Sequence, residues 1–275
     1  MYKRTDMADE CISEYQEYDN VHRNKRGKIF DITEIIIDDD SFFESMGKHK
    51  GKYITLECKN LGDFSGDDNE MICELADEFK NMIPDGDVLV CGLGNRDITP
   101  DAIGPFTASK ILATRHLKDE LAHQDNFLKS LRRVSVFAGG VLGQTGIETA
   151  EIISALCSQI KPSAVIAADA LACSDINRLG NSIQITDTGI SPGSGVENSR
   201  KEISSYSLGI PVIAVGVPTV VDLRNITENM GENCDMVVTP RNIDRLAERS
   251  AQLISFALNS ALQPMLTLKE IRSLF

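Results

Sequence analysis

"VLVCGLGNRDITPDAIGP", residues 88–105, is the stretch that decides the fold class of this chain. It begins with an apolar run that has no alternating polar positions, as expected for a strand covered on both faces. The run ends at Gly92 and Gly94, and two acids, Asp97 and Asp101, follow. A strand that breaks into a glycine turn before a helix is typical of a β–α unit, in which function collects just past the carboxyl end of the strand.

Further strands are predicted on both sides of this unit. Continuous apolar runs predict buried strands at 163–171 and 211–218, and a further strand is predicted at 134–140. Alternation of polar and apolar residues predicts an edge or half-covered strand at 182–190. Two additional N-terminal strands are expected at 29–38 and 51–57.

Helical spacing of apolar residues fills the gaps between the strands. It predicts helices at 67–83, 106–122, 145–160 and 239–262. The third of these opens on a capping box made by Thr145 and Glu148, and the last has Thr239 as its cap. The alternation of strands and helices predicts an α/β fold, with a mostly parallel sheet covered by helices on both faces.

Composition limits the classes of function. The 275 residues carry a formal net charge of −13, so nucleic acid and anionic membranes are not expected partners. Residues 1–28 are polar and are expected to form a loosely docked segment, followed by a single α/β domain at 29–275. The chain has no apolar run of roughly 18 residues and no signal-peptide core at its start. Its seven cysteines form no C-x-x-C pair, which favours a reduced, cytoplasmic compartment.

Three acids fall at predicted strand ends: Asp101, Asp169 and Asp187. Asp169 has apolar neighbours on both sides, and a carboxylate in such surroundings is costly to bury unless it is paired. Burial also raises the pKa of a carboxyl group, which suits a general acid. Asp97 and Asp101 have a plainer interpretation as helix-entry residues, because an acid in the first turn interacts favourably with the helix dipole. The residues alone leave both interpretations of Asp101 open.

The glycine loop is a poor match to a nucleotide-binding loop. Gly92 and Gly94 occupy the first two positions of a G-x-G-x-x-G pattern, but Asp97 occupies the third and adds negative charge where a pyrophosphate would lie. We therefore expect no nucleotide, and no cofactor of another kind is indicated. Asp187 begins a D-T-G triplet like that of pepsin-like proteases. Those enzymes are all-β and need two copies, whereas this α/β pattern holds one.

Several longer motifs resemble one known family. These are "GLGNRDITPDAIGP", "GQTGIETAEII", "VIAADALA", "QITDTGISPGSGVENSRKEIS" and "LGIPVIAVGVPTVVD". They resemble the bacterial spore germination proteases, endopeptidases that begin the degradation of small acid-soluble spore proteins. The resemblance implies a three-layer α/β/α sandwich, related to the hydrogenase-maturation endopeptidases, and a pair of catalytic aspartates. By motif these are Asp101 in "TPDAIG" and Asp169 in "AADALA". Asn95, Asp97 and Asp187 are candidates for lining the same site.

The resemblance also implies a zymogen that removes its own N-terminal segment. Substrates of the family are cut after a glutamate, before an apolar residue and alanine, with another acid close behind. The stretch Asp6-Met7-Ala8-Asp9-Glu10 is similar to such a site. We therefore expect self-cleavage between Asp6 and Met7, with residues 1–6 as the prosegment. The implied substrates are small acid-soluble spore proteins in the forespore or spore core, and the implied assembly is a tetramer of identical chains.

In the expected mechanism, one of Asp101 and Asp169 acts as an ionised base on water and the other as a protonated acid, with the higher pKa at Asp169. Two alternatives remain: a metal-dependent endopeptidase of the hydrogenase-maturation type, and a scaffold that binds spore proteins without cutting them. Maturation endopeptidases hold a metal with two carboxylates and a histidine. Here no histidine follows residue 123, and His116 lies ~22 Å beyond Asp101 if one helix joins them. A metal site is therefore not expected.

Overall fold

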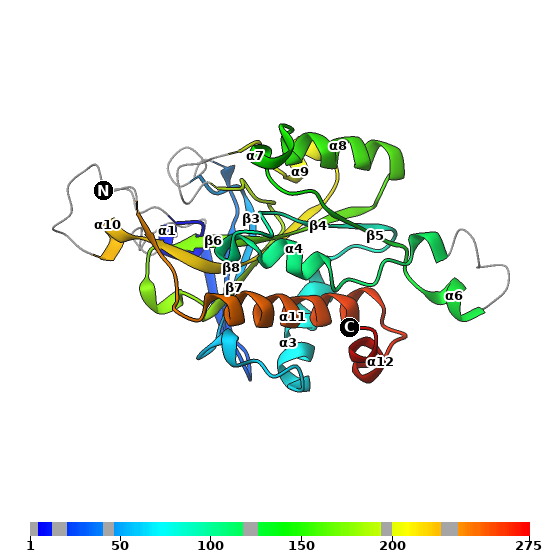
Figure 1. Ribbon diagram of the computed structural model, residues 1–275, viewed down its shortest axis with the longest axis horizontal. Helices are drawn as coiled ribbons and strands as arrows, with labels where there is room; N and C mark the ends of the chain where they lie inside the picture. The colour runs from blue at the N-terminus through cyan, green and yellow to red at the C-terminus, as the bar shows by residue number, and fades with distance from the viewer. Residues whose placement is uncertain (1–4, 13–20, 41–46, 118–125, 194–199, 227–235) are drawn as a thin grey trace.

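The computed structural model describes residues 5–12, 21–40, 47–117, 126–193, 200–226 and 236–275. Nine strands of this part form one mixed sheet in the order β1-β2-β3-β7-β8-β6-β4-β5, with β9 paired to β8 (Figure 1). The strands are β1 Val21–Arg26, β2 Asp31–Ile37, β3 Gly51–Glu57, β4 Val88–Gly92, β5 Val134–Ala138, β6 Ala164–Cys173, β7 Ser182–Thr186, β8 Val212–Asp222 and β9 Val237–Val238.

The sheet has two halves that differ in strand direction. The strands β5, β4, β6 and β8 run parallel to one another. On the other side of β8, the strands β7, β3, β2 and β1 each run antiparallel to their neighbours. The buried runs of β4, β6 and β8 agree with their lack of polar alternation, because both faces of such strands are covered, whereas the edge strand β5 is only partly buried.

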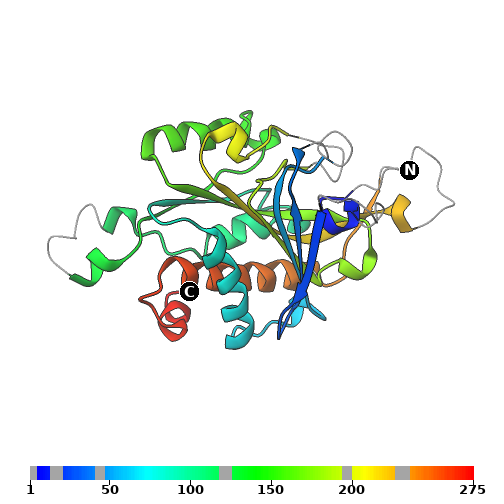
Figure 2. The ribbon, with the colours of Figure 1, turned by 180° about the vertical axis from the view of Figure 1, so that it is seen from behind.

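Helices cover both faces of the sheet (Figures 1 and 2). They are α1 Ala8–Ile12, α3 Asn69–Met82, α4 Ile103–Ala108, α6 Asn126–Ser130, α7 Leu142–Thr145, α8 Thr149–Ile160, α9 Ser205–Leu208, α10 Leu223–Ile226, α11 Ile243–Leu262 and α12 Leu268–Ser273. The expected three-layer α/β/α sandwich is confirmed: α3 and α11 lie on one face, and α7, α8 and α9 on the other. In the described part of the chain, no helix is both long and apolar enough to cross a bilayer.

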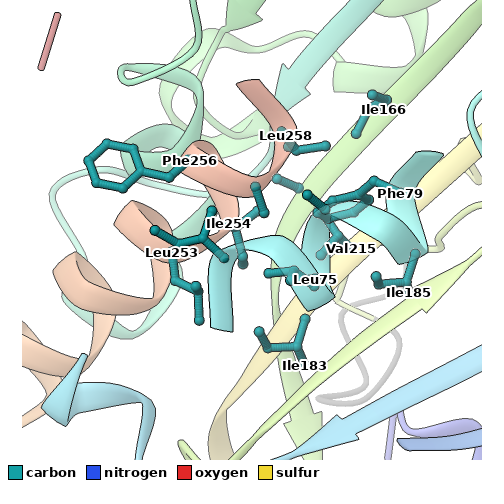
Figure 3. Close-up of a cluster of buried hydrophobic side chains, with 14 of the residues drawn as sticks. Leu75, Phe79, Ile166, Ile183, Ile185, Val215, Leu253, Ile254, Phe256 and Leu258 are labelled. Atoms are coloured by element: carbon teal, nitrogen blue, oxygen red, sulfur yellow. The ribbon is translucent and has the colours of Figure 1, made fainter. Parts of the chain in front are cut away.

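The larger core lies between the sheet and the pair α3 and α11. Figure 3 shows Leu75 and Phe79 of α3 packed among side chains of α11, β6, β7 and β8. Ile254 and Leu258 of α11 are fully buried there. Burying one such side chain stabilises the fold by about 1.5–3 kcal/mol. On the opposite face, Ile153 of α8 packs on the apolar side chains of β4 and β6.

The expected continuous helix at 106–122 is interrupted: α4 ends at Ala108, and residues 115–117 are helical again after a non-helical stretch at 109–114. Beyond α4, Asn259 of α11 binds the backbone in place of a continuing helix. The Asn259 side chain accepts a hydrogen bond from the Leu112 N–H at 2.9 Å and donates one to the Lys110 carbonyl at 2.8 Å. These tertiary bonds satisfy the backbone groups that a further helical turn would use. Residues 118–122 of that expectation lie outside the described residues.

Both predicted threonine caps are also wrong. Thr145 ends α7 instead of opening α8: its hydroxyl donates to the Val141 carbonyl, and α8 begins at Thr149 with Glu148 as the cap residue. The hydroxyl of Thr239 donates to the Thr219 carbonyl at 2.8 Å. Asn242 is the cap residue of α11. An N-cap side chain accepts an N–H of the first helical turn: the Thr145 hydroxyl accepts the N–H of Ile147, which precedes α8, and the Thr239 hydroxyl donates to a carbonyl.

Two expectations about the edges of the sheet need correction. The strand at 182–190 is not an edge strand, since β7 is buried along its whole length between β3 and β8. The N-terminal residues are not loosely docked where they are described. Residues 21–26 form the edge strand β1, which pairs with β2, and most of residues 7–12 are buried. The N-terminal part of the chain therefore belongs to the same folded body as the rest.

Candidate active site

Asp101 is brought to the end of β4 by a sharp turn at Gly94. Gly94 has a φ of +103°, and a Cβ added there would lie 2.1 Å from the Asp101 carbonyl oxygen. Only glycine fits this conformation and this close approach. The turn carries the chain into the 3-10 helix η3 (Thr99–Asp101), so that Oδ2 of Asp101 accepts a hydrogen bond from the Asn95 N–H at 2.7 Å. Asn95 thus holds Asp101 through its backbone.

Asp169 lies inside β6, not at the end of a strand as expected. The pairing of β4 with β6 stops at Gly92 and Ala168. Asp169 is therefore the first residue of β6 beyond the end of β4, and its neighbour on that side is the turn that carries Asp101. Asp169 is 5% exposed, and its Oδ1 accepts the N–H of Ala170 at 2.9 Å. The place of Asp169 beside this turn is thus set by the end of the shorter neighbouring strand, β4.

Asp101 and Asp169 line one cavity of about 510 Å³ at the carboxyl ends of β4 and β6. Asn95 lines the same cavity, and so does Asp6 from the N-terminal segment. The cavity is also bordered by apolar side chains such as Leu142, which limit the contact of the carboxylates with water. Two acids 68 residues apart in the sequence therefore face the same space.

Burial sets the electrostatics of this pair. It raises the pKa of Asp169 well above its ordinary value, and the charges of Asp101 and Asp6 raise it further. Burial also raises the pKa of Asp101, opposed by the hydrogen bond from the Asn95 N–H. The negative charge of Asp101 thus favours the protonated form of Asp169 over a state in which both carboxyl groups are ionised. The site can therefore offer one acid and one base at the same time.

Asp97 lies beside the cavity but lines a different hollow. It borders a second pocket, which Gly94, Arg96 and Gln144 also line. Its backbone N–H donates to the Asn95 side chain at 2.9 Å. Asp97 therefore supports the turn that carries Asn95 and Asp101, and it is not among the described residues that line the cavity.

Asp187 lies away from the other two acids. It is exposed, and its Oδ1 accepts the N–H of Lys52 at 2.7 Å. The expectation that its strand end joins the other two is wrong because β7 runs antiparallel to β8. Through β8, Thr186 is level with Ala167, so Asp187 lies about 10 Å along the strand direction from the level of Asp169.

The structure places the peptide bond between Asp6 and Met7 beside this site. The Asp6 N–H donates to the Ala172 carbonyl at 2.9 Å, and the Ala172 N–H donates to Oδ2 of Asp6 at 2.8 Å. Met7 and Ala8 are fully buried. The segment is therefore bound to β6 beyond Asp169 through Asp6, which forms a bend, and it continues into the short helix α1.

Two polar side chains that the sequence did not single out hold the Asp6 carbonyl. Its oxygen accepts hydrogen bonds from Nζ of Lys48 at 2.7 Å and from Nε2 of Gln184 at 3.1 Å. Oε1 of Gln184 accepts the Ala8 N–H at 2.7 Å, so the amide clamps the segment on both sides of Met7. Gln184 is one of three alternating polar residues of β7, with Ser182 and Thr186, so the sequence pattern did not single it out.

The described residues contain no group of three or more His, Cys, Asp or Glu side chains arranged to hold a metal ion. Cys91 is buried among apolar side chains, as expected for a small hydrophobic residue, and burial raises the pKa of its thiol. The chemistry that this site offers from its own side chains is therefore carboxylate acid–base chemistry.

Known proteins that are similar to this chain include several germination proteases. The family model for germination proteases matches residues 2–232. A germination protease of Caldanaerobacter subterraneus subsp. tengcongensis is 40% identical over 317 aligned positions, which cover 98% of this chain and 97% of that protein. The germination protease of Clostridium acetobutylicum is 38% identical over 320 positions, with the same coverage. That of Bacillus subtilis is 45% identical over 193 positions, 68% of this chain and 52% of its own.

Among solved structures, a nickel–iron hydrogenase maturation protease from Thermococcus kodakarensis KOD1 is similar, with a TM-score of 0.39 and 18% identity. The match covers 66% of this chain and 98% of that one. The sequence matches span nearly the whole chain and include both motifs that carry Asp101 and Asp169. This chain belongs to the germination protease family of peptidases.

Proposed function

We propose that this protein is the endopeptidase that initiates degradation of small acid-soluble spore proteins, cutting after an acidic residue with Asp101 and Asp169. The observation that carries the proposal is the meeting of these two carboxyl groups in one largely apolar cavity. Its membership of the germination protease family supports a peptidase that acts in spore germination. The aspartate pair supplies a hydrolytic chemistry that needs no cofactor.

The proposed roles follow from the surroundings of each acid. Asp169 is the more deeply buried, and it carries a proton as the general acid. Asp101 receives the hydrogen bond from the Asn95 N–H, which favours its ionised form. Ionised Asp101 takes a proton from a water molecule as that water attacks the peptide carbonyl. Asp169 donates its proton to the carbonyl oxygen. Asp101 then passes the proton that it took from water to the leaving amine as the C–N bond breaks, and Asp169 recovers its proton as the carbonyl group re-forms.

We also propose that the chain is a zymogen and that the bond between Asp6 and Met7 is its own first substrate. The Asp6 carbonyl lies between two donors, the ammonium of Lys48 and the side-chain amide of Gln184. Donors that already point at a carbonyl oxygen stabilise the negative charge that develops there during attack. The two hydrogen bonds between Asp6 and Ala172 hold this part of the segment next to the cavity. Residues 1–6 are then released as the prosegment.

A peptide containing Glu-Ile-Ala-Ser-Glu tests the first proposal. The purified chain should cut it after the first glutamate, with and without a chelator, and both Asp101→Asn and Asp169→Asn should fail to cut it. Loss of cleavage on addition of chelator would favour the metal-dependent alternative. Binding of the peptide by wild type without any cut would favour the scaffold.

N-terminal sequencing tests the self-cleavage. After incubation under conditions that make the chain active on the peptide, the sequence should begin at Met7. A chain that cuts the peptide while keeping Met1 intact would contradict the proposed processing site and leave the peptidase proposal standing.

A further inference from the structure

The side-chain amide of Asn95 is fixed at one end and unpaired at the other. Its Oδ1 accepts two hydrogen bonds, from Nε2 of Gln144 at 2.8 Å and from the backbone N–H of Asp97 at 2.9 Å. A backbone N–H can only donate, so the end of the amide that binds Asp97 is the oxygen and the other end is the amino group. None of the residues that the structure describes binds this amino group, Nδ2, and they do not enclose it.

The two ends of this amide face different hollows of the molecule. Of the described residues, Asp97 and Gln144 border the second pocket but not the cavity that holds the two aspartates. Asn95 borders that cavity but is not among the described residues that line the second pocket. The Oδ1 end is therefore held on the side of the second pocket. Nδ2 lies at the opposite end of the amide and points into the cavity.

The backbone of Asn95 places this amide beside Asp101. The Asn95 N–H donates to Oδ2 of Asp101 at 2.7 Å, so the side chain of Asn95 starts next to an atom that binds the carboxylate. The donor Gln184, which binds the Asp6 carbonyl oxygen, belongs to β7 and lies on the other side of β6 from β4. Nδ2 therefore lies on the side of the base, and the carbonyl oxygen is held on the opposite side.

We propose that Nδ2 of Asn95 holds the water molecule that attacks the peptide carbonyl. The water accepts a hydrogen bond from Nδ2 and donates one to the carboxylate of Asp101, which leaves its second lone pair for the carbonyl carbon. Asp101 takes the donated proton during the attack, whereas Asn95 keeps its protons throughout. A water molecule fixed in this way reacts at a lower entropic cost. The inference rests on the proposed function and adds a third residue to its reaction.

The test measures binding of two labelled probes that cannot be cut, both based on Glu-Ile-Ala-Ser-Glu. In the first probe a difluoroketone replaces the peptide bond after the first glutamate. Water converts this ketone into a geminal diol, and one of its hydroxyls takes the place of the attacking water. In the second probe an ethylene group replaces the same bond and offers no oxygen. Fluorescence anisotropy gives both dissociation constants, and their ratio cancels competition by the chain's own N-terminal segment.

Two variants of Asn95 remove the donor in different ways. Asn95→Ser loses the amide but keeps a hydroxyl that can accept the Asp97 N–H, as serine does in turns of this kind. The preference of the chain for the diol over the ethylene probe should fall about tenfold, as expected for the loss of one hydrogen bond. Asn95→Asp keeps an oxygen for both donors and loses only the amino group. It should lower the preference at least as much, and it serves if Asn95→Ser does not fold.

Asn60→Ser is the matched control. Oδ1 of Asn60 accepts the N–H of Gly62, two residues further on, at 2.9 Å, so this variant changes a turn of the same kind. Asn60 is not among the described residues that line the cavity, and its variant should keep the wild-type preference for the diol.

Kinetics on the cleavable peptide separate the water from the peptide. Asn95→Ser should lower kcat about a hundredfold and leave KM unchanged, because Nδ2 binds the water and not the peptide. A rise in KM with an unchanged kcat would contradict the proposed role.

A wild-type preference for the diol that persists in both Asn95 variants would overturn the water site. Equal binding of the two probes to wild type, or an equal fall in Asn60→Ser, would overturn it as well. These outcomes differ from failure of the proposed function. A chain that cuts the peptide but whose preference does not depend on Asn95 loses only the water site. A chain whose preference depends on Asn95 but that never cuts loses only the peptidase.

Discussion

The parallel and antiparallel halves of the sheet place similar acids in different surroundings. In the parallel half, β4 and β6 end at the same edge, so Asp101 and Asp169 share a cavity. In the antiparallel half, β7 ends at the opposite edge, and Asp187 is exposed and bound to the start of β3. The antiparallel half contributes instead Gln184, which lies level with Asp169 across β8 and holds the N-terminal segment. Strand direction therefore decides which acids can act together.

The largest expected effect is a difference in activity between variants of the acids in the two halves of the sheet. Asp101→Asn and Asp169→Asn should each lower kcat/KM for the peptide by about a thousandfold or more, because each removes one partner of the acid–base pair. Asp187→Asn should stay within about threefold of wild type. Initial rates on the peptide measure all three. A loss of activity in Asp187→Asn as large as that in Asp101→Asn would contradict the assignment of the active site to the parallel half.

A change at the turn after β4 should destabilise the parallel half. Gly94→Ala places a Cβ 2.1 Å from the Asp101 carbonyl oxygen at a φ of +103°, so we expect a loss of about 3 kcal/mol in the free energy of unfolding. Gly143→Ala, in α7, meets no atom within 4 Å and should change stability by less than about 1 kcal/mol. Urea unfolding of both variants provides the measurement, and equal stabilities would contradict the role of the turn.

A lysine near the antiparallel half should matter for self-cleavage. Lys48→Met removes the ammonium that donates to the Asp6 carbonyl, and we expect the rate of self-cleavage to fall about a hundredfold. Lys50→Met is the control, because its backbone N–H, which the substitution keeps, donates to Asp40. The rate is read from the shift of the chain on a gel over time. An unchanged rate in Lys48→Met would exclude the carbonyl contact from the reaction.

The smallest expected effect concerns stability and pH. The pKa of Asp169 is raised in the folded state, so between about pH 4 and that raised pKa the folded chain binds more protons than the unfolded one, and its stability falls as pH rises. Asp169→Asn removes this cost and should raise the free energy of unfolding at pH 7. The gain should vanish below about pH 4, where both states are protonated. Thermal unfolding of the variant and of wild type at pH 4 and pH 7 provides the measurement. A variant that is less stable than wild type at pH 7 would contradict the cost of burying the Asp169 carboxylate.

Much of the parallel half could be predicted from the sequence. Continuous apolar runs mark β4, β6 and β8, and Asp169 stands out because its neighbours are apolar. The direction of β7 was also readable, although it was missed. Only residues 174–181 separate β6 from β7, and a crossover between parallel strands needs about a dozen residues. That short connection excludes a parallel β7, and with it a shared edge for Asp187 and Asp169.

Other features depend on contacts between distant residues and carry no local pattern. The end of α4 is set by Asn259, which lies about 150 positions away in the sequence. The docking of the N-terminal segment depends on Ala172, Gln184 and Lys48 together. Sequence motifs singled out the two candidate acids and the bond between Asp6 and Met7. The donors around that bond, Lys48 and Gln184, lie far apart in the sequence, and only the fold brings them together.

The docked segment has a consequence for the order of events after the proposed self-cleavage. The bond between Asp6 and Met7 can be cut, yet Met7, Ala8 and Glu10 remain joined to β1 through the intervening chain. A tethered ligand acts as if it were present at about millimolar concentration. Removal of residues 1–6 therefore leaves a competitor in the groove, and a spore-protein substrate must displace it. On the proposed function, the newly cut chain is inhibited by its own end, and its activity grows with the local concentration of the substrate.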